Sequence, residues 1–176
     1  MVSGPSIAIV DYDPNWPALF EAERGRILSA TGHLVVVIEH VGSTAVPGLA
    51  AKPVIDIMAA VRHLDDARKC IEPLHAVGYE YVPEYEAELP ERRYFHKGPS
   101  GDRTHHLHMV ELTSDFWKRH LLFRDYLRAH PGTARQYQEL KRRLAAQFGA
   151  DRSGYTEAKG PFIRAVEEKA RAINLV

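Results

Sequence analysis

The feature that most constrains the fold is an apolar segment that runs into Gly42-Ser43 and is followed by a second apolar segment carrying one carboxylate. Residues 34–41 predict a buried strand, and residues 53–61 predict another, in which Asp56 stands in an otherwise apolar run. A carboxylate in such surroundings needs a cation or hydrogen-bond donors to offset its desolvation. We therefore expect a functional site where the two strands meet.

The turn between these strands has the chemistry of a phosphate-binding loop. Gly42 lets a backbone approach a phosphate closely, and the hydroxyl groups of Ser43 and Thr44 are donors. Asp56 on the next strand is a ligand for a divalent cation that bridges such phosphates. The alternative is an ordinary hairpin-like turn, with Asp56 as a polar residue near a strand end.

The remaining pattern predicts an α+β domain spanning residues 1–176, with a mixed sheet flanked by helices and a helical C-terminal half. The sheet-rich part covers about 5–113 and the helical part about 114–176. An extended arm at 5–12 and a helix from Asp13-Pro14 to Gly32 come first. We then expect helices at 65–76, 115–129, 132–148 and 156–173 and strands at 79–82, 92–97 and 104–112.

Composition narrows the class of protein. The 23 basic and 23 acidic residues balance, so no global field favours nucleic acid or membrane. No apolar run is long enough to span a bilayer, and the N-terminus lacks a signal-peptide pattern, which predicts a cytoplasmic protein. The one cysteine, Cys70, is predicted to be a packed thiol. Trp16 and Trp117 fall on apolar helical stripes and are expected in the core.

A second polar constellation lies on the strand predicted at 104–112. Its alternation places His106 and His108 on one face and Leu107 and Met109 on the other. If this strand neighbours that of Asp56, the two histidines and the carboxylate are candidate catalytic residues and candidate ligands for Mg²⁺, Mn²⁺ or Zn²⁺. The alternative is a structural hydrogen-bonding role for both histidines.

The quoted motifs carry a family resemblance. The segment HVGSTAVPGLAAKPVIDIMAAV, the later HLHMVE and the terminal YTEAKGPFIRAVEEKA resemble the GrpB family, over roughly residues 7 to 173. That family is related to nucleotidyltransferases and occurs fused to dephospho-CoA kinase in some proteins. The resemblance implies a nucleotidyltransferase-like fold, and Gly42, Ser43 and Asp56 match the superfamily pattern.

One position departs from that pattern. The superfamily has two carboxylates two residues apart on one strand, and Met58 stands where the second would be. A thioether is a poor ligand for Mg²⁺, so the usual two-metal mechanism does not follow from the resemblance, and Met58 is expected in the core.

Several cations are candidates to neutralise a phosphorylated ligand. Lys52 and Arg93 accompany the predicted strands, and Tyr155 and Lys159 share a helical face that the resemblance assigns to the same cleft. The run Lys141-Arg142-Arg143 is instead predicted to be a solvated helix face.

Three functions follow from these residues. The first is a metal-assisted nucleotidyl or phosphoryl transferase acting on a nucleotide or another phosphorylated small molecule. The second is a degenerate module that binds a nucleotide or a coenzyme A precursor without chemistry, which Met58 favours. The third is a metal-dependent hydrolase that uses His106 and His108. Residues 83–103 are either a lid over the cleft or a surface loop.

Overall fold

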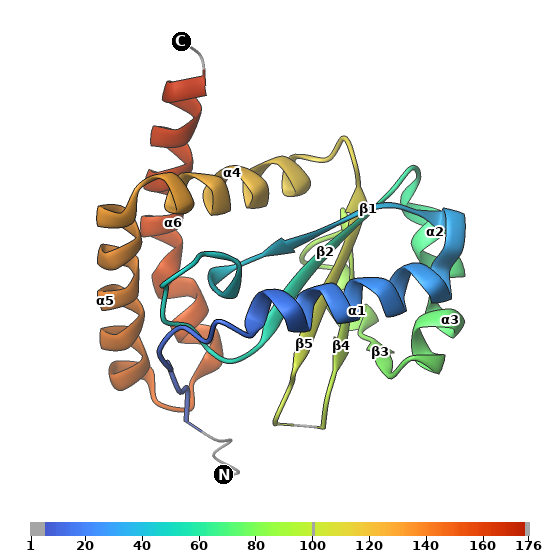
Figure 1. Cartoon of the computed structure of the whole chain (residues 1–176), viewed down its shortest axis with the longest axis horizontal. Helices are drawn as coiled ribbons and strands as arrows, with labels where there is room; N and C mark the ends of the chain where they lie inside the picture. The colour runs from blue at the N-terminus through green and yellow to red at the C-terminus, as the bar shows by residue number, and fades with distance from the viewer. Residues whose placement is uncertain (1–5, 100, 175–176) are drawn as a thin grey trace.

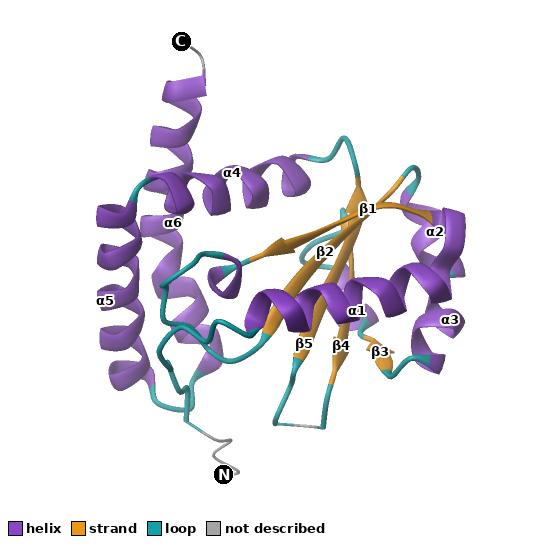
Figure 2. Cartoon of the chain, viewed as in Figure 1, coloured by secondary structure: helices purple, strands orange, loops and turns teal. Residues whose placement is uncertain are grey.

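The protein is built on one five-stranded sheet with helices on both faces (Figures 1 and 2). The computed structural model describes residues 6–99 and 101–174; residue 5 of the predicted arm lies outside them. The strand order is β1-β2-β5-β4-β3, and among these described strands β2 and β5 pair in parallel while the other pairs are antiparallel. The strands are β1 (Val35–Val41), β2 (Ile55–Val61), β3 (Tyr79–Tyr81), β4 (Arg92–Lys97) and β5 (His105–Glu111).

The two faces of the sheet carry different side chains. One face buries Ile57, Leu107 and Met109 beneath α1 (Trp16–Thr31), α2 (Leu64–Lys69) and α3 (Ile71–Ala76). The opposite face carries Asp56 and His106, which are register partners on β2 and β5. The alternation predicted for the histidine strand is therefore confirmed: His106 and His108 share the face of Asp56, and Leu107 and Met109 are buried on the other.

The C-terminal helices close the polar face and one end of the sheet. They are α4 (Asp115–Ala129), α5 (Pro131–Phe148) and α6 (Arg152–Asn174). Helix α4 packs Phe116 and Trp117 against Met58 and Val110, while α5 and α6 stand side by side beyond the sheet end (Figure 1). The predicted α+β architecture with a helical C-terminal half is confirmed, and Met58 lies in the core with 0% exposure.

Two local predictions were wrong. The helix expected at 65–76 is two helices, α2 and α3, separated at Cys70. The first helix begins at Trp16 rather than at Asp13-Pro14, because the Asp13 carboxylate accepts the backbone N–H of Asn15 in a turn before it. The Cys70 thiol is buried, as predicted, and burial raises its pKa to about 11. Trp16 and Trp117 are also buried.

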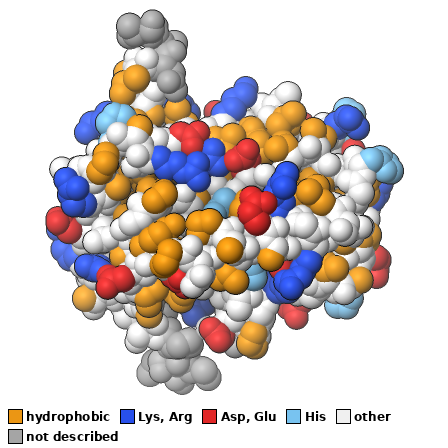
Figure 3. Space-filling view, viewed as in Figure 1, with side chains coloured by type: hydrophobic (Ala, Val, Ile, Leu, Met, Phe, Trp, Pro, Cys, Tyr) orange, Lys and Arg blue, Asp and Glu red, His pale blue; other side chains and the backbone are white. Residues whose placement is uncertain are grey.

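The surface is mixed in charge. On the face shown in Figure 3, Lys and Arg groups are interspersed with Asp, Glu and apolar side chains. This agrees with the balanced composition and gives no continuous basic surface on that face. Within the described ranges, no helix combines the length and apolar character required to cross a membrane.

A buried ion pair fixes α1 to the sheet. Glu23 is only 1% exposed, and its Oε1 atom lies 2.7 Å from Nζ of Lys97 on β4. The exposed Arg26 contacts the other carboxylate oxygen at 2.9 Å. Burial alone would raise the pKa of Glu23, but these two partners outweigh it and lower the pKa.

Replacing one partner of this pair should leave a buried charge poorly compensated. Lys97→Met is expected to reduce the free energy of unfolding by roughly 3 kcal/mol at pH 7. Arg26→Met, which removes the exposed partner, should reduce it by only about 1 kcal/mol. Urea unfolding monitored by circular dichroism measures both. Equal losses from the two variants would contradict a dominant role for Lys97.

Candidate functional site

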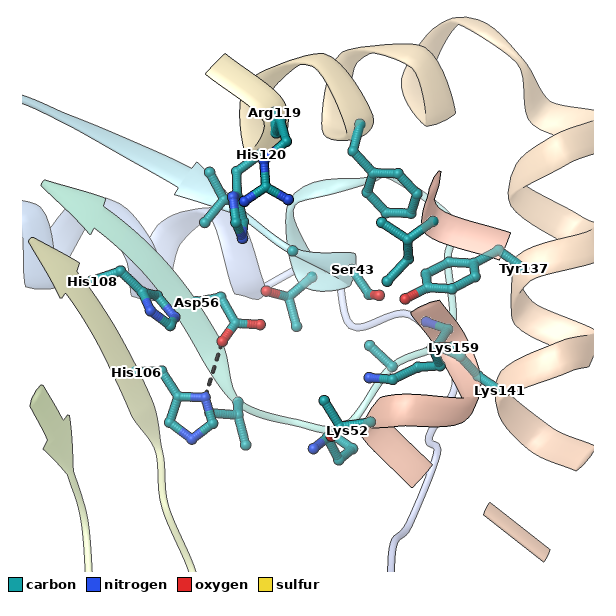
Figure 4. Close-up of a pocket in the computed structure, with 18 of the residues that line it drawn as sticks. Ser43, Lys52, Asp56, His106, His108, Arg119, His120, Tyr137, Lys141 and Lys159 are labelled. Atoms are coloured by element: carbon teal, nitrogen blue, oxygen red, sulfur yellow. Dashed lines mark hydrogen bonds and ion pairs between the residues drawn. The ribbon is translucent and has the colours of Figure 1, made fainter. Parts of the chain in front are cut away.

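A pocket of about 460 Å³ lies between the polar face of the sheet and the three C-terminal helices (Figure 4). The sheet contributes Asp56, His106 and His108, and the turn after β1 contributes Gly42 and Ser43. The segment that leads into β2 adds Lys52, and helices α4, α5 and α6 supply most of the remaining wall. The predicted cleft residues that line the pocket are Gly42, Ser43, Thr44, Lys52, Asp56, His106, His108, Tyr155 and Lys159.

The turn after β1 is held directly against the carboxylate of β2. Gly42 has φ +71°, a left-handed conformation that favours glycine, and a Cβ atom there would lie 2.5 Å from Oδ2 of Asp56. Ser43 begins a short 3₁₀ turn, and its hydroxyl lies near that of Tyr137 (Figure 4). Thr44 is buried, and its hydroxyl is hydrogen-bonded to Nε2 of His40. Ser43 therefore presents the hydroxyl of this turn to the pocket.

Asp56 and His106 form a hydrogen-bonded pair. Nδ1 of His106 donates to Oδ1 of Asp56 over 3.0 Å, which leaves Nε2 of His106 to exchange protons with other groups. Burial would raise the pKa of Asp56, but this bond and the charges of His106, His108 and Lys52 lower it to about 2. Asp56 is therefore ionised at neutral pH.

Two further imidazoles in the pocket are held neutral. Burial, with the nearby Arg92 charge, lowers the pKa of His108 well below its ordinary value. Its Nδ1 accepts from the Arg92 guanidinium over 3.2 Å, so Nε2 carries the proton. His120 has the opposite tautomer, because its Nδ1 donates to the Phe116 carbonyl over 2.8 Å. Burial also lowers the pKa of His120.

Three lysines from three separate segments meet opposite the Asp56–His106 pair (Figure 4). The ammonium groups of Lys52 and Lys159 lie 5.5 and 4.3 Å from the centre of the same Tyr155 ring. Lys141 donates to the Ala50 carbonyl and lies 4.9 Å from the centre of the Tyr137 ring. Burial, reinforced by mutual repulsion, lowers the pKa of Lys141 to about 7 and that of Lys159 to about 8.

Two predictions about the basic residues were wrong. Arg93 does not line the pocket, because it pairs with Met109 in register and so points to the opposite face of the sheet. There it donates to the Pro90 carbonyl and lies 3.4 Å from Glu86. Lys141 is not part of a solvated face: it is 2% exposed and lines the pocket.

Further pocket residues were missed. On α5, Tyr137 and Lys141 have the i, i+4 spacing of one helical face. On α6, extending the Tyr155 and Lys159 face gives Thr156, Ile163 and Glu167. The sequence contains this helical periodicity, but packing decides which face of each helix meets the pocket. Arg119 and His120 on α4 carry no comparable signal, and among the described residues of 83–103 none reaches the pocket, so a lid role receives no support.

The predicted three-ligand metal site does not assemble. In the described part of the chain, no three His, Cys, Asp or Glu side chains are arranged to hold a metal ion. Oδ1 of Asp56 accepts a hydrogen bond from His106, and Nδ1 of His108 accepts one from Arg92. The position two residues after Asp56 is the fully buried Met58. The donor set therefore does not fit a protein-held Mg²⁺, which prefers several oxygen ligands.

Comparison with known proteins places the chain in a family. Residues 6–169 match the family model described as GrpB protein. The chain belongs to the GrpB family. A crystal structure of GrpB from Enterococcus faecalis is 35% identical and covers 96% of this chain and 100% of that chain, with a TM-score of 0.87. The GrpB resemblance of the sequence motifs is thus confirmed.

Longer proteins also contain a GrpB segment. The UPF0157 protein YqkA of Bacillus subtilis is 41% identical over 94% of this chain, which spans 47% of that protein. A protein named dephospho-CoA kinase from Mycolicibacterium paratuberculosis is 32% identical over 93% of this chain and 46% of its own length. The chain therefore spans about half the length of these relatives.

A more distant likeness is to a solved transferase structure. Terminal uridylyl transferase 4 from Trypanosoma brucei, solved with bound CTP, gives a TM-score of 0.48 at 15% identity, covering 79% of this chain and 46% of that chain. Likeness at this level transfers neither a nucleotide nor a reaction to the GrpB chain.

The contact between Gly42 and Asp56 can be tested by substitution. Gly42→Ala is expected to destabilise the protein by about 1–3 kcal/mol through backbone strain and to displace the Asp56 carboxylate. Gly48→Ala is the matched control, since Gly48 has φ +78° but open space where a Cβ would stand. Chemical denaturation and NMR titration of the carboxylates measure the two effects. A change in the Asp56 titration for both variants would contradict a specific contact.

The repulsion among the pocket lysines should lower the stability of the ligand-free protein. The pKa of Lys159 is about 8 when folded and near 10.5 when unfolded, so charging it opposes folding below pH 8, and this penalty fades as the pH rises toward 10.5. Lys159→Met should therefore raise Tm at pH 7 by about 2–4 °C, the shift that ~1 kcal/mol produces in a chain of this size. The exposed Lys118→Met is the control. Calorimetry showing a lower Tm for Lys159→Met would contradict the argument.

Proposed function

We propose that the pocket binds a phosphorylated small molecule, with a nucleotide as the first candidate, and transfers its nucleotidyl or phosphoryl group to an acceptor. The observation that carries this proposal is the division of the pocket into two sides. Lys52, Lys141 and Lys159 gather on one side, and the Asp56–His106 pair faces them. An anion suits the first side, and a group that loses a proton suits the second.

The phosphates would lie along the turn after β1. The Ser43 hydroxyl and the lysine ammonium groups are donors on that side, and Tyr155 holds two of the lysines through its ring. Arg119 adds a fourth cation at the pocket wall, partly neutralised by Asp115 at 2.9 Å. Such fixed donors stabilise the charge that develops on a leaving phosphate.

The proton transfer would use the dyad of Asp56 and His106. The acceptor oxygen attacks phosphorus, and the bond from phosphorus to the leaving phosphate oxygen breaks. The acceptor proton passes to Nε2 of His106, which Asp56 orients through Nδ1. The leaving group departs with its electron pair toward the lysines. No step is assigned to a metal, because the donor set does not fit one.

A binding module without chemistry is the second candidate. Met58 favours it, since the position of a second carboxylate is filled by a fully buried side chain. Relatives named dephospho-CoA kinase add a phosphorylated coenzyme precursor to the ligands worth testing. This candidate shares the anionic ligand of the first and differs only in turnover.

Asp56→Asn separates the two candidates. Asparagine keeps an acceptor for His106 but loses the charge, so turnover should fall by at least about 100-fold, the range of general acid–base catalysis. Binding of a nucleoside triphosphate should persist or tighten, because a negative charge near the phosphates is gone. The measurements are transfer of labelled nucleotide to a panel of hydroxyl and amine acceptors and calorimetric titration.

The exposed Asp65→Asn serves as the control, with turnover and binding expected to match the unsubstituted protein. Undiminished turnover in Asp56→Asn would overturn the role of the dyad. Unchanged binding with no turnover in any variant would favour the binding module. Absence of binding by nucleotides, phosphorylated coenzyme precursors and sugar phosphates would overturn both candidates.

A further inference from the structure

We propose that Lys52, Lys141 and Lys159 form a cation-independent receptor for an oligophosphate chain, taking the neutralising role that a protein-held divalent cation would otherwise have. The inference rests on the proposed function and narrows its ligand from any phosphorylated molecule to one with at least two linked phosphates. It follows from three features of the pocket: the small number of its carboxylates, the number of its lysines, and the placement of those lysines.

The pocket has too few free oxygen ligands to hold a cation. Asp56 and Glu167 are its two carboxylates among the described residues. One oxygen of Asp56 accepts from His106, while Glu167 lies 4.0 Å from Arg119. A second carboxylate beside Asp56 is prevented by Met58, which packs beneath Phe116 and Trp117 of α4.

The pocket has more positive charge than its own acids balance. Within the described residues, Lys52, Lys141 and Lys159 make no ion pair with a carboxylate of the protein. Their counterparts are the Tyr137 and Tyr155 rings and one backbone carbonyl. Like charges held together in a partly buried site call for a ligand with several negative charges.

The geometry selects a chain of phosphates rather than one phosphate. Lys52 and Lys159 share the Tyr155 ring, whereas Lys141 comes from another helix and lies over the Tyr137 ring. Ser43 lies on the same side of the pocket, with its hydroxyl beside that of Tyr137 and above Lys159 in the view of Figure 4. A ligand that contacts the lysines at the Tyr155 ring, the lysine at the Tyr137 ring and the Ser43 hydroxyl needs negative charge along its length. A di- or triphosphate has such a distribution of charge.

The test is calorimetric titration of the full chain with inorganic tripolyphosphate and with ATP, in chelator and in excess Mg²⁺. The dissociation constants in chelator should equal those in Mg²⁺ within about threefold or be smaller, because Mg²⁺ competes with the lysines for the phosphate oxygens of the ligand. Inorganic monophosphate should bind at least tenfold more weakly. The inference would be overturned if binding required Mg²⁺ or if Mg²⁺ strengthened binding by tenfold or more. Either result would leave the proposed function intact.

Variants locate the binding. Lys52→Met and Lys159→Met keep the apolar stem and should each weaken tripolyphosphate at least tenfold in chelator. The exposed Lys118→Met and Lys169→Met should leave it unchanged, and circular dichroism confirms that each variant is folded. Equal losses of affinity in the pocket variants and in the surface variants would assign binding to general surface charge and overturn the inference. No binding of any phosphorylated ligand in either condition would overturn the proposed function itself.

Discussion

The parallel pairing of β2 with β5 is the constraint on which the site depends. Its register sets Asp56 opposite His106 and Met58 opposite His108. Because side chains alternate along a strand, a slip of one residue would move Asp56 into the apolar layer under α1 and bring Ile57 to the pocket. Burial of Ile57 and Leu107 in that layer therefore helps to hold the Asp56–His106 pair on the pocket face.

The helical half completes what the sheet begins. The sheet supplies an ionised carboxylate and imidazoles, whereas all but one of the lysines come from α5 and α6. Residues distant in sequence are thereby gathered around one cavity, and their charges are kept apart by the width of the pocket. Lowered lysine pKa values are the consequence of this arrangement, since burial and mutual repulsion both disfavour the charged form.

The sequence predicted the elements and the sheet side of the site because both follow from local patterns. Strand alternation identified His106 and His108, and an acid in an apolar run identified Asp56. Arg93 was assigned to the pocket because a charged residue on a neighbouring strand gives no information about which face it occupies. Its partner Met109 decides that, and the pairing is long-range.

Lys141 shows a different limit. Two arginines follow it, and both are exposed, so the run has the composition of a solvated face. The direction of α5 is set by Tyr137 and Leu144, which are buried against other elements and carry Lys141 inward with them. Helical periodicity states which residues share a face, but only tertiary packing states what that face meets.

The single carboxylate of the sheet side also has a structural cause. Met58 is fully buried under Phe116 and Trp117, so an aspartate there would lie in an apolar layer, whereas the side chain of Asp56 is 32% exposed. The packing of α4 on the sheet therefore disfavours a second carboxylate at position 58. With α4 packed in this way, the cations of the pocket come from outside the strands: Lys52 precedes β2, Arg119 is on α4, and Lys141 and Lys159 are on α5 and α6.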